Sequence, residues 1–401
     1  MLLLRNIGRL FTAGVAGTIE NAAIALEGDR IVWVGSDRER PGTPPDVEEV
    51  QEVDCGGALV TPGLIDAHTH PLYGGTRFAE IAARSAGASY LEVAAAGGGI
   101  ASSVRATRAA APEALLRDTE RRLASWLSGG TTTVEAKTGY FLERAGEIEA
   151  VRTLAGFASA PDHPDVPRVD VTFLGAHAVG PEWAGDQGGY VEEVISWCDA
   201  AAAAGARHCD VFCDEGYFTV EESRRLLEAG HSAGMIPRIH ADEIARTGGA
   251  ELAAQLRCAS ADHLLRITPD DADALADAGV VATLAPTTAL AMGVRPPVDA
   301  LREAGTMVAL ATDHNPGQSG TTSMSLVVGL AVTGLGLSVD EAVTAATAGG
   351  AASLRRFDRG RIEAGLLADL VAWDADHEGA FAWALGLQPT AIWLGGRSLS
   401  L

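Results

Sequence analysis

The feature that most restricts the fold is a repeated alternation of short apolar runs with helical stretches between about residues 61 and 352. The runs have the length and composition of buried parallel strands: residues 131–136, 169–174, 209–213, 237–241, 280–285 and 307–312. Repeated strand–helix units of this number predict an α/β fold, a (β/α)₈ TIM-like barrel, and an open doubly wound sheet is the alternative. Polar residues directly follow strand after strand, which favours the barrel, because a barrel carries its active site at that face.

Helix-start patterns lie between these runs. Thr219 followed by Glu222, and Ser338 followed by Glu341, are capping boxes. The two ends of the chain lack this strand–helix alternation. Their sequences predict short strands, with a hairpin at residues 28–29. We therefore predict a composite β-domain, a small β-sandwich, from residues 1–60 plus 353–401, and a barrel from residues 61–352.

The formal net charge of −23 restricts the partners. Such a surface repels nucleic acid and anionic membranes, so neither is expected to bind. The five cysteines form no CxxC pair and predict reduced thiols. Cys209 and Cys213 could be metal ligands, but their place at the two ends of an apolar run favours core packing. With no signal-peptide core and no apolar run of about 18 residues, we expect a soluble cytoplasmic protein.

The strongest local motif is the pair His68 and His70, directly after an apolar run that begins with Pro62-Gly63. Residues i and i+2 of a strand point to the same side, so both imidazoles can reach one ion. Two exposed loop histidines are the plainer interpretation.

Further strand ends carry residues that suit a metal-dependent hydrolase. His240 could supply a third ligand, and Glu243 a carboxylate for proton transfer, although Glu243 would also suit a helix N-terminus. Asp313 could bind the metal and accept a proton from water, or begin an Asx turn. His263 could polarise a carbonyl, ligate a second metal or pack in the core. Three histidines and one aspartate fit one Zn²⁺ or Fe²⁺ ion with an open position for water.

These motifs resemble those of the amidohydrolase superfamily, and within it those of the imidazolonepropionase family. The resemblance spans about residues 59–320 and is carried by PGLIDAHTH, HPLYGGTRFAE, GASYLEVAAAGGGIASSVRATRAA, TVEAKTGY, TFLGAHAV, DVFCDEG, HADE, SADHL and ATDHNPG. The block from GASY to VRATR is the most discriminating, because other amidohydrolases do not share it.

The resemblance implies a hydrolase that opens 4-imidazolone-5-propanoate to N-formimidoyl-L-glutamate in histidine degradation, and a homodimer. It implies His68, His70, His240 and Asp313 as metal ligands, Glu243 as proton relay, and His263 as the group that polarises the ring carbonyl. It also implies contacts to the ring, the propionate or the product from Arg77, Tyr140, His177, Asn315 and Gly317. An arginine suits the propionate, since guanidinium and carboxylate pair in a bidentate fork.

Four residues depart from the family pattern near the expected pocket, namely Phe141, Thr287, His314 and Gln318. They leave open a related imidazolone or a hydantoin-like ring as substrate. A cytosine- or guanine-type aminohydrolase is a second interpretation, and an inactive barrel kept as an assembly module is a third. Lys137, in the KTGY segment, is expected to have a structural or electrostatic role rather than to bridge two metals.

Overall fold

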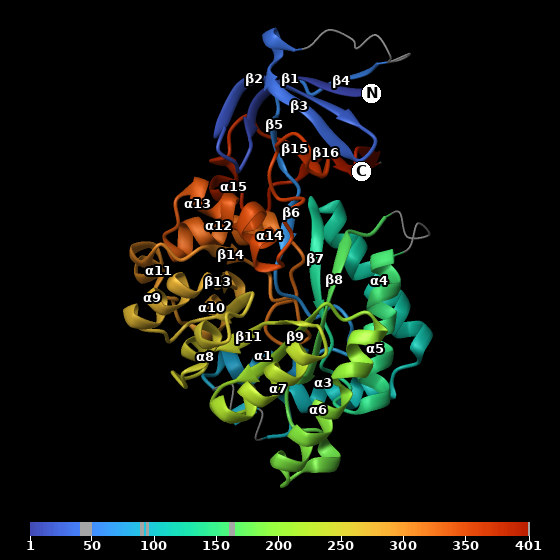
Figure 1. Cartoon of the computed structure of the whole chain (residues 1–401), viewed down its shortest axis with the longest axis vertical. Coiled ribbons are helices and arrows are strands. Elements are labelled where there is room, and N and C mark those ends of the chain that lie inside the picture. Colours follow the sequence, from blue (N-terminus) through green and yellow to red (C-terminus); the bar gives the residue numbers. More distant parts are fainter. Residues whose placement is uncertain (41–49, 89–91, 94–95, 160–164, 400–401) are drawn as a thin grey trace.

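The computed structural model describes residues 1–40, 50–88, 92–93, 96–159 and 165–399. Residues 89–91 and 94–95 of the GASY block lie outside the described residues. Two bodies are visible in Figure 1: a small β-domain that contains both chain ends, and a larger body of strands covered by helices.

The larger body is a parallel barrel, as predicted. Its strands follow one another in chain order around the sheet: β6 Leu64–Asp66, β7 Thr131–Lys137, β8 Arg168–Ala176, β9 His208–Cys213, β11 Ile239–Ala241, β12 Ser260–His263, β13 Val281–Leu284 and β14 Val308–Leu310. A short strand, β10 Ile236–Pro237, also pairs with β9. The segments that follow β6 and β14 close the ring, since Asp313 N donates to His68 O at 3.1 Å and His70 N donates to His314 O at 2.8 Å. This closure already brings two predicted metal-site segments together.

Helices cover the outside of the barrel (Figure 1). They are α1 Phe78–Ser85, α3 Gly99–Ala109, α4 Pro112–Ser128, α5 Arg144–Ser159, α6 Gln187–Ala204, α7 Val220–Ser232, α8 Gly249–Gln255, α9 Pro269–Ala278, α10 Pro286–Met292, α11 Val298–Ala304, α12 Met324–Leu330, α13 Val339–Thr344 and α14 Gly350–Ser353. The predicted capping boxes are present at Thr219 and Ser338, where each side chain accepts a hydrogen bond from the third residue of its helix.

The two chain ends form one eight-stranded sheet, which confirms the predicted composite β-domain. Its strands are β1 Leu2–Phe11, β2 Thr18–Glu27, β3 Arg30–Ser36, β4 Gln51–Asp54, β5 Leu59–Pro62, β15 Leu370–Trp373, β16 Pro389–Leu394 and β17 Arg397–Leu399. Strand β5 joins the two ends, because it pairs with β1 on one side and with β15 on the other. Gly28, at φ +57°, makes the predicted hairpin turn between β2 and β3. The boundaries at residues 60/61 and 352/353 stay a prediction.

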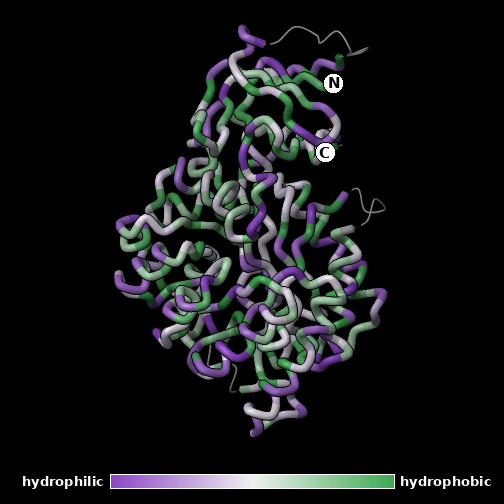
Figure 2. The backbone as a smooth tube through the Cα atoms, viewed as in Figure 1, coloured by the Kyte–Doolittle hydropathy of each residue, from purple (hydrophilic) through white to green (hydrophobic). Residues whose placement is uncertain are grey.

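The β-domain has an apolar core of its own, and the barrel core extends into this domain at Phe11, Leu59 and Trp373. The barrel core includes Trp126, Leu154, Trp197 and Leu284, and the β-domain core includes Leu4, Ile24 and Trp393. In Figure 2, hydrophobic and hydrophilic stretches are interspersed along the coloured part of the backbone in both bodies. In the described part of the chain, no helix has the length and apolar character needed to cross a membrane.

Candidate active site and metal centre

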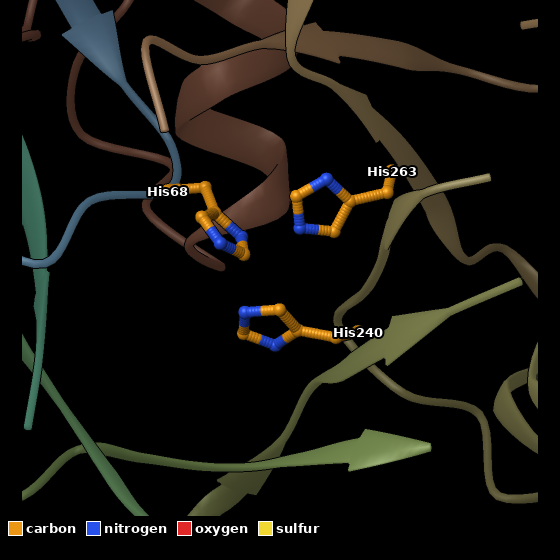
Figure 3. A group of neighbouring side chains, drawn as sticks. All are labelled: His68, His240 and His263. Atoms are coloured by element: carbon orange, nitrogen blue, oxygen red, sulfur yellow. The ribbon is translucent and has the colours of Figure 1, made fainter. Parts of the chain in front are cut away.

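The predicted ligands converge at the carboxyl ends of the barrel strands. His68 and His70 follow β6, His240 lies in β11, His263 ends β12, and Asp313 follows β14. All five side chains are buried. Figure 3 shows the rings of His68, His240 and His263 facing one shared space from different strands. The expected ring of polar groups at one barrel face is therefore present.

The distances between donor atoms fit a shared cation. His70 Nε2 lies 3.3 Å from His68 Nε2, and the two nitrogens lie 3.7 and 3.6 Å from Asp313 Oδ1. Two ligands that each lie about 2.1 Å from a tetrahedral ion are separated by about 3.4 Å. His240 lies near a second group that shares His68, because one ligand atom each of His68, His240 and His263 lie within 4.8 Å of one another.

The protonation state of the histidines also suits a bound metal ion. Burial lowers the pKa of His68 and of His70 well below the usual value, and the positive charge of Lys137 adds to this effect. Both imidazoles are therefore neutral, which is the form that binds a metal. His70 Nδ1 and His263 Nδ1 are buried and have no hydrogen-bond partner among the described residues. The residues present thus fit a divalent cation.

Carboxylates behind two of the histidines set the direction of their rings. His68 Nδ1 lies 2.6 Å from Asp262 Oδ2, and His240 Nδ1 lies 3.0 Å from Asp210 Oδ2. The His68 contact is a hydrogen bond of the kind that a metal-binding histidine commonly makes to a carboxylate, which leaves Nε2 free as a ligand, whereas His240 Nδ1 lies within ion-pair distance of Asp210. Arg238 and Lys137 outweigh the effect of burial and lower the pKa of Asp262 to about 2, so this carboxylate is ionised.

Asp313 is held in an unusual backbone conformation at φ +48°. Its Oδ2 accepts a hydrogen bond from Thr288 Oγ1, and its carbonyl oxygen accepts one from Asn315 Nδ2 at 2.8 Å. Burial raises the pKa of Asp313 to about 6, against the opposing effect of Thr288 and His240. A non-glycine residue at positive φ costs energy and persists only where its surroundings enforce it, as at functional sites.

Glu243 lies on a loop that Asp214 organises. The Asp214 carboxylate accepts backbone N–H groups from Glu243 at 2.7 Å, Ile244 at 2.9 Å and Ala245 at 3.0 Å. Burial, together with the negative charges of Asp313 and Asp214, raises the pKa of Glu243 well above its usual value. Glu243 Oε2 is 3.8 Å from His263 Nε2. A carboxyl group with a raised pKa therefore lies beside His263.

One cavity joins almost all the predicted substrate contacts. It is lined by His70, Arg77, Ile100, Tyr140, His177, Phe212, His240, Glu243, His263, Asp313, Asn315 and Gln318. His68 lies beside it, and Gly317 lies against Arg77, where a Cβ on Gly317 would be 1.2 Å from Arg77 Nη2. His177 stacks on His70, with centroids 5.1 Å apart, and its Nδ1 donates to Gly139 O at 3.0 Å. The geometry thus gathers every residue that the sequence predicted for the site.

Comparison with known proteins identifies the family. The amidohydrolase family model matches residues 218–397. An imidazolonepropionase of Anaeromyxobacter dehalogenans is 43% identical over 386 residues, which cover 94% of this chain and 90% of the relative. Those of Geobacillus kaustophilus and Streptomyces griseus are 44% and 42% identical, over 90% and 95% of this chain and 85% and 93% of the relatives. The chain belongs to the imidazolonepropionase family.

Solved structures share the family's fold at low sequence identity. A zinc-bound adenosine deaminase from Xanthomonas campestris has a TM-score of 0.73 at 22% identity, and covers 99% of this chain and 92% of its own. An atrazine chlorohydrolase from Arthrobacter aurescens complexed with zinc has a TM-score of 0.69 at 19% identity, and covers 100% of this chain and 95% of its own. These likenesses bear on the fold alone. The family relatives favour amide hydrolysis over the aminohydrolase and the inactive-module interpretations.

Of the four departures from the imidazolonepropionase pattern, only Gln318 lines the cavity. His314 Nε2 pairs with Tyr73 Oη at 3.1 Å, outside the cavity wall. Thr287 Oγ1 donates to Thr312 O at 2.7 Å, and the Phe141 N–H donates to Glu147 Oε1 at 2.8 Å. Three of the departures therefore support the walls rather than contact a bound ring.

Several groups that hold the site were not predicted from the sequence. Glu147 is fully buried and accepts N–H groups from Gly139 at 2.9 Å and Leu142 at 2.9 Å, which fixes the loop that carries Tyr140. Phe212 and Ile100 contribute apolar side chains to the wall of the cavity. Nothing in the local sequence separates such residues from ordinary helix or core positions, although the DVFCDEG segment contains Asp210, Phe212 and Asp214.

Proposed function

We propose that this protein hydrolyses the ring amide of 4-imidazolone-5-propanoate to give N-formimidoyl-L-glutamate, a step of histidine degradation. The observation that carries the proposal is a single cavity that places His70, His240 and Asp313, with His68 beside it, next to the Glu243 carboxyl group of raised pKa and the cation of Arg77. A ring amide with an anionic side chain needs these three kinds of group. The relatives named imidazolonepropionase support the same substrate.

In this proposal one divalent cation, zinc or iron, would be held by His68, His70, His240 and Asp313. When bound, such an ion lowers the pKa of a water molecule and polarises a carbonyl group. Neutral imidazoles and a carboxylate suit either element. Elemental analysis of protein purified without added metal would show which one is bound.

The chain's own residues would handle the protons. Asp313, whose pKa burial raises to about 6, is suited to accept a proton from the attacking water. Glu243, protonated in its buried setting, would donate to the ring nitrogen as the carbon–nitrogen bond breaks. His263 remains neutral, because burial and His240 lower its pKa to about 3. It would orient the carbonyl oxygen through one ring nitrogen.

The remaining wall would recognise the substrate. Arg77 would pair with the propionate, because a guanidinium binds a carboxylate through two parallel hydrogen bonds. Tyr140 and His177 would contact the ring. Asn315 and Gly317 would hold the opened product, with Asn315 Oδ1 fixing the Gly317 N–H at 2.8 Å.

We also propose a homodimer that works in the cytoplasm, where its free cysteines stay reduced. Light scattering coupled to gel filtration measures the subunit number, and a monomer at micromolar concentration would contradict the dimer.

The decisive test is an assay with freshly generated 4-imidazolone-5-propanoate, followed by the loss of imidazolone ultraviolet absorbance. Wild-type protein should open the ring, and Asp313→Ala should lower kcat by at least about 10²-fold, since it loses a ligand and a proton acceptor. Absence of ring opening by the wild-type protein would reject the substrate. Equal rates in both proteins would reject the role of Asp313.

A further inference from the structure

The chain contains one lysine. The sequence has 30 basic residues, of which Lys137 is the single lysine and all the others are arginine. Lysine is ordinarily a surface residue, because its ammonium group is strongly hydrated. Here its side chain is fully buried at the end of strand β7. A chain that uses arginine everywhere else has kept a lysine at one interior position.

The contacts of Lys137 reach three carboxylates. Its Nζ donates to Asp210 Oδ2 at 2.7 Å and to Glu135 Oε1 at 2.9 Å, and it lies 3.6 Å from Asp262 Oδ2. All three carboxylates are at most 5% exposed as residues. The ammonium group is therefore the shared centre of a buried charge cluster.

Each of these carboxylates holds a different part of the metal centre. Asp262 contacts His68 Nδ1 at 2.6 Å, and Asp210 contacts His240 Nδ1 at 3.0 Å. Glu135 Oε2 accepts the N–H of Thr69, which lies between His68 and His70, at 3.1 Å. The Lys137 backbone N–H also donates to Thr69 O at 2.9 Å. Lys137 is thus connected through a single carboxylate to each segment that carries a histidine of the proposed ligand set.

The shape of the ammonium group explains why arginine is absent here. An ammonium nitrogen donates in three directions from one point, whereas a guanidinium presents a planar fork. Arg238, which is also fully buried, contacts the edge of the cluster: its Nη2 lies 3.3 Å from Asp262 Oδ2 and donates to Ala67 O at 2.7 Å. Without Lys137, three buried carboxylates would share one cation, which is a costly arrangement.

We infer that Lys137 is a positioning residue for the metal centre: it fixes Asp262, Asp210 and Glu135, which in turn orient His68, His240 and the segment between His68 and His70. The inference rests on the proposed metal-dependent function. It assigns Lys137 no contact with substrate and no place in the proton transfers.

The first test measures metal affinity instead of activity. Lys137→Met keeps the length of the side chain and removes its charge. Competition with a chromogenic chelator should show zinc binding weakened about 10- to 100-fold, the usual loss when groups behind metal ligands are removed. The matched control is Arg359→Met, which also removes a buried cation near strand β7, at Thr133 Oγ1, but one that contacts none of the three carboxylates. Its zinc affinity should stay at the wild-type value.

The second test needs no variant and remains informative if Lys137→Met does not fold. Wild-type protein made with [ε-¹³C]lysine and no lysine-bearing tag gives a single labelled side-chain resonance. That resonance should shift as the first equivalent of Zn²⁺ is added and then stop moving. An unchanged resonance while zinc binds would overturn the inference, as would equal zinc affinities of wild type and Lys137→Met, or equal losses in Lys137→Met and Arg359→Met.

A wild-type protein that binds neither Zn²⁺ nor Fe²⁺ would give a different result. It would reject the proposed function, and the inference with it, whereas the outcomes above reject the inference alone.

Discussion

Replacing Gly317 by alanine should displace Arg77 and leave the fold intact. A Cβ at this position would lie 1.2 Å from Arg77 Nη2 and 1.9 Å from Cζ, so the guanidinium must move by about 2 Å to reach ordinary contact. Gly317 has no positive φ, so alanine costs no backbone strain. Because the obstructed atoms are the far end of a flexible side chain, the free energy of unfolding should fall by less than about 1 kcal/mol.

The expected loss is in substrate binding. A hydrogen-bonded contact to a charged group contributes about 1.5–3 kcal/mol, which corresponds to roughly 10- to 150-fold in kcat/KM at 25 °C. The propionate lies away from the reacting carbon, so most of the change should be in KM. Steady-state assays with 4-imidazolone-5-propanoate measure this directly. An analogue with a carboxamide in place of the carboxylate should show little difference between the two proteins.

The same loop offers a matched control. Gly320 has open space around its Cβ position and no positive φ, so Gly320→Ala should retain wild-type kcat/KM. A Gly317→Ala enzyme with wild-type KM would refute the placement of the propionate at Arg77. Equal losses in both variants would show that the loop, and not the guanidinium, was disturbed.

Three further changes test the rest of the site. Glu243→Gln should lower kcat by about 10²- to 10⁴-fold through loss of a proton donor, with metal content unchanged by elemental analysis; a near-normal kcat would exclude proton transfer by Glu243. Asp214→Ala leaves the backbone N–H groups of the Glu243 loop without their acceptor. Denaturant titration should therefore show a free energy of unfolding lower by about 1–3 kcal/mol or more, and kcat should also fall. An unchanged kcat would show that the loop does not affect catalysis. Removal of metal with a chelator should lower Tm and abolish activity, and Zn²⁺ or Fe²⁺ should restore both, because a ligand that binds only the folded state stabilises it; an unchanged Tm would argue against a bound ion.

The sequence predicted the barrel and the metal-site residues for the same physical reason. Parallel strands that point the same way put all their carboxyl ends at one face, so a polar residue after each strand is already placed near the others. His68, His70, His240 and Asp313 could be assigned from strand ends alone. Assigning these four residues did not require the register of strand pairing, because each residue follows its strand or lies at the end of it.

The groups behind the ligands depend on register, which is why they were not predicted. Asp262 lies opposite His240 in the pairing of β11 with β12, and its carboxylate reaches His68 on a strand remote in sequence. Asp210 looks like any acidic residue in an apolar run until β9 is placed beside β11. The positive φ values of Asp313 and His263, +48° and +75°, are likewise invisible in the sequence, since only a few per cent of non-glycine residues adopt positive φ even though Asp and His are enriched among them.

For Lys137, the composition of the chain points to a role that the local sequence does not reveal. The KTGY motif predicted only a structural or electrostatic role for Lys137. Its burial alone would also be consistent with an ion pair that has no part in the metal centre. The composition adds a second observation: every other basic position of the chain is arginine, and only position 137 is lysine. A three-way contact to Asp210, Glu135 and Asp262 supplies a reason, because only a compact ammonium group can serve three carboxylates from one point. If that reason holds, the metal centre depends on a residue that never contacts the metal, and its affinity for zinc should report the loss of Lys137 even in a protein that is fully folded.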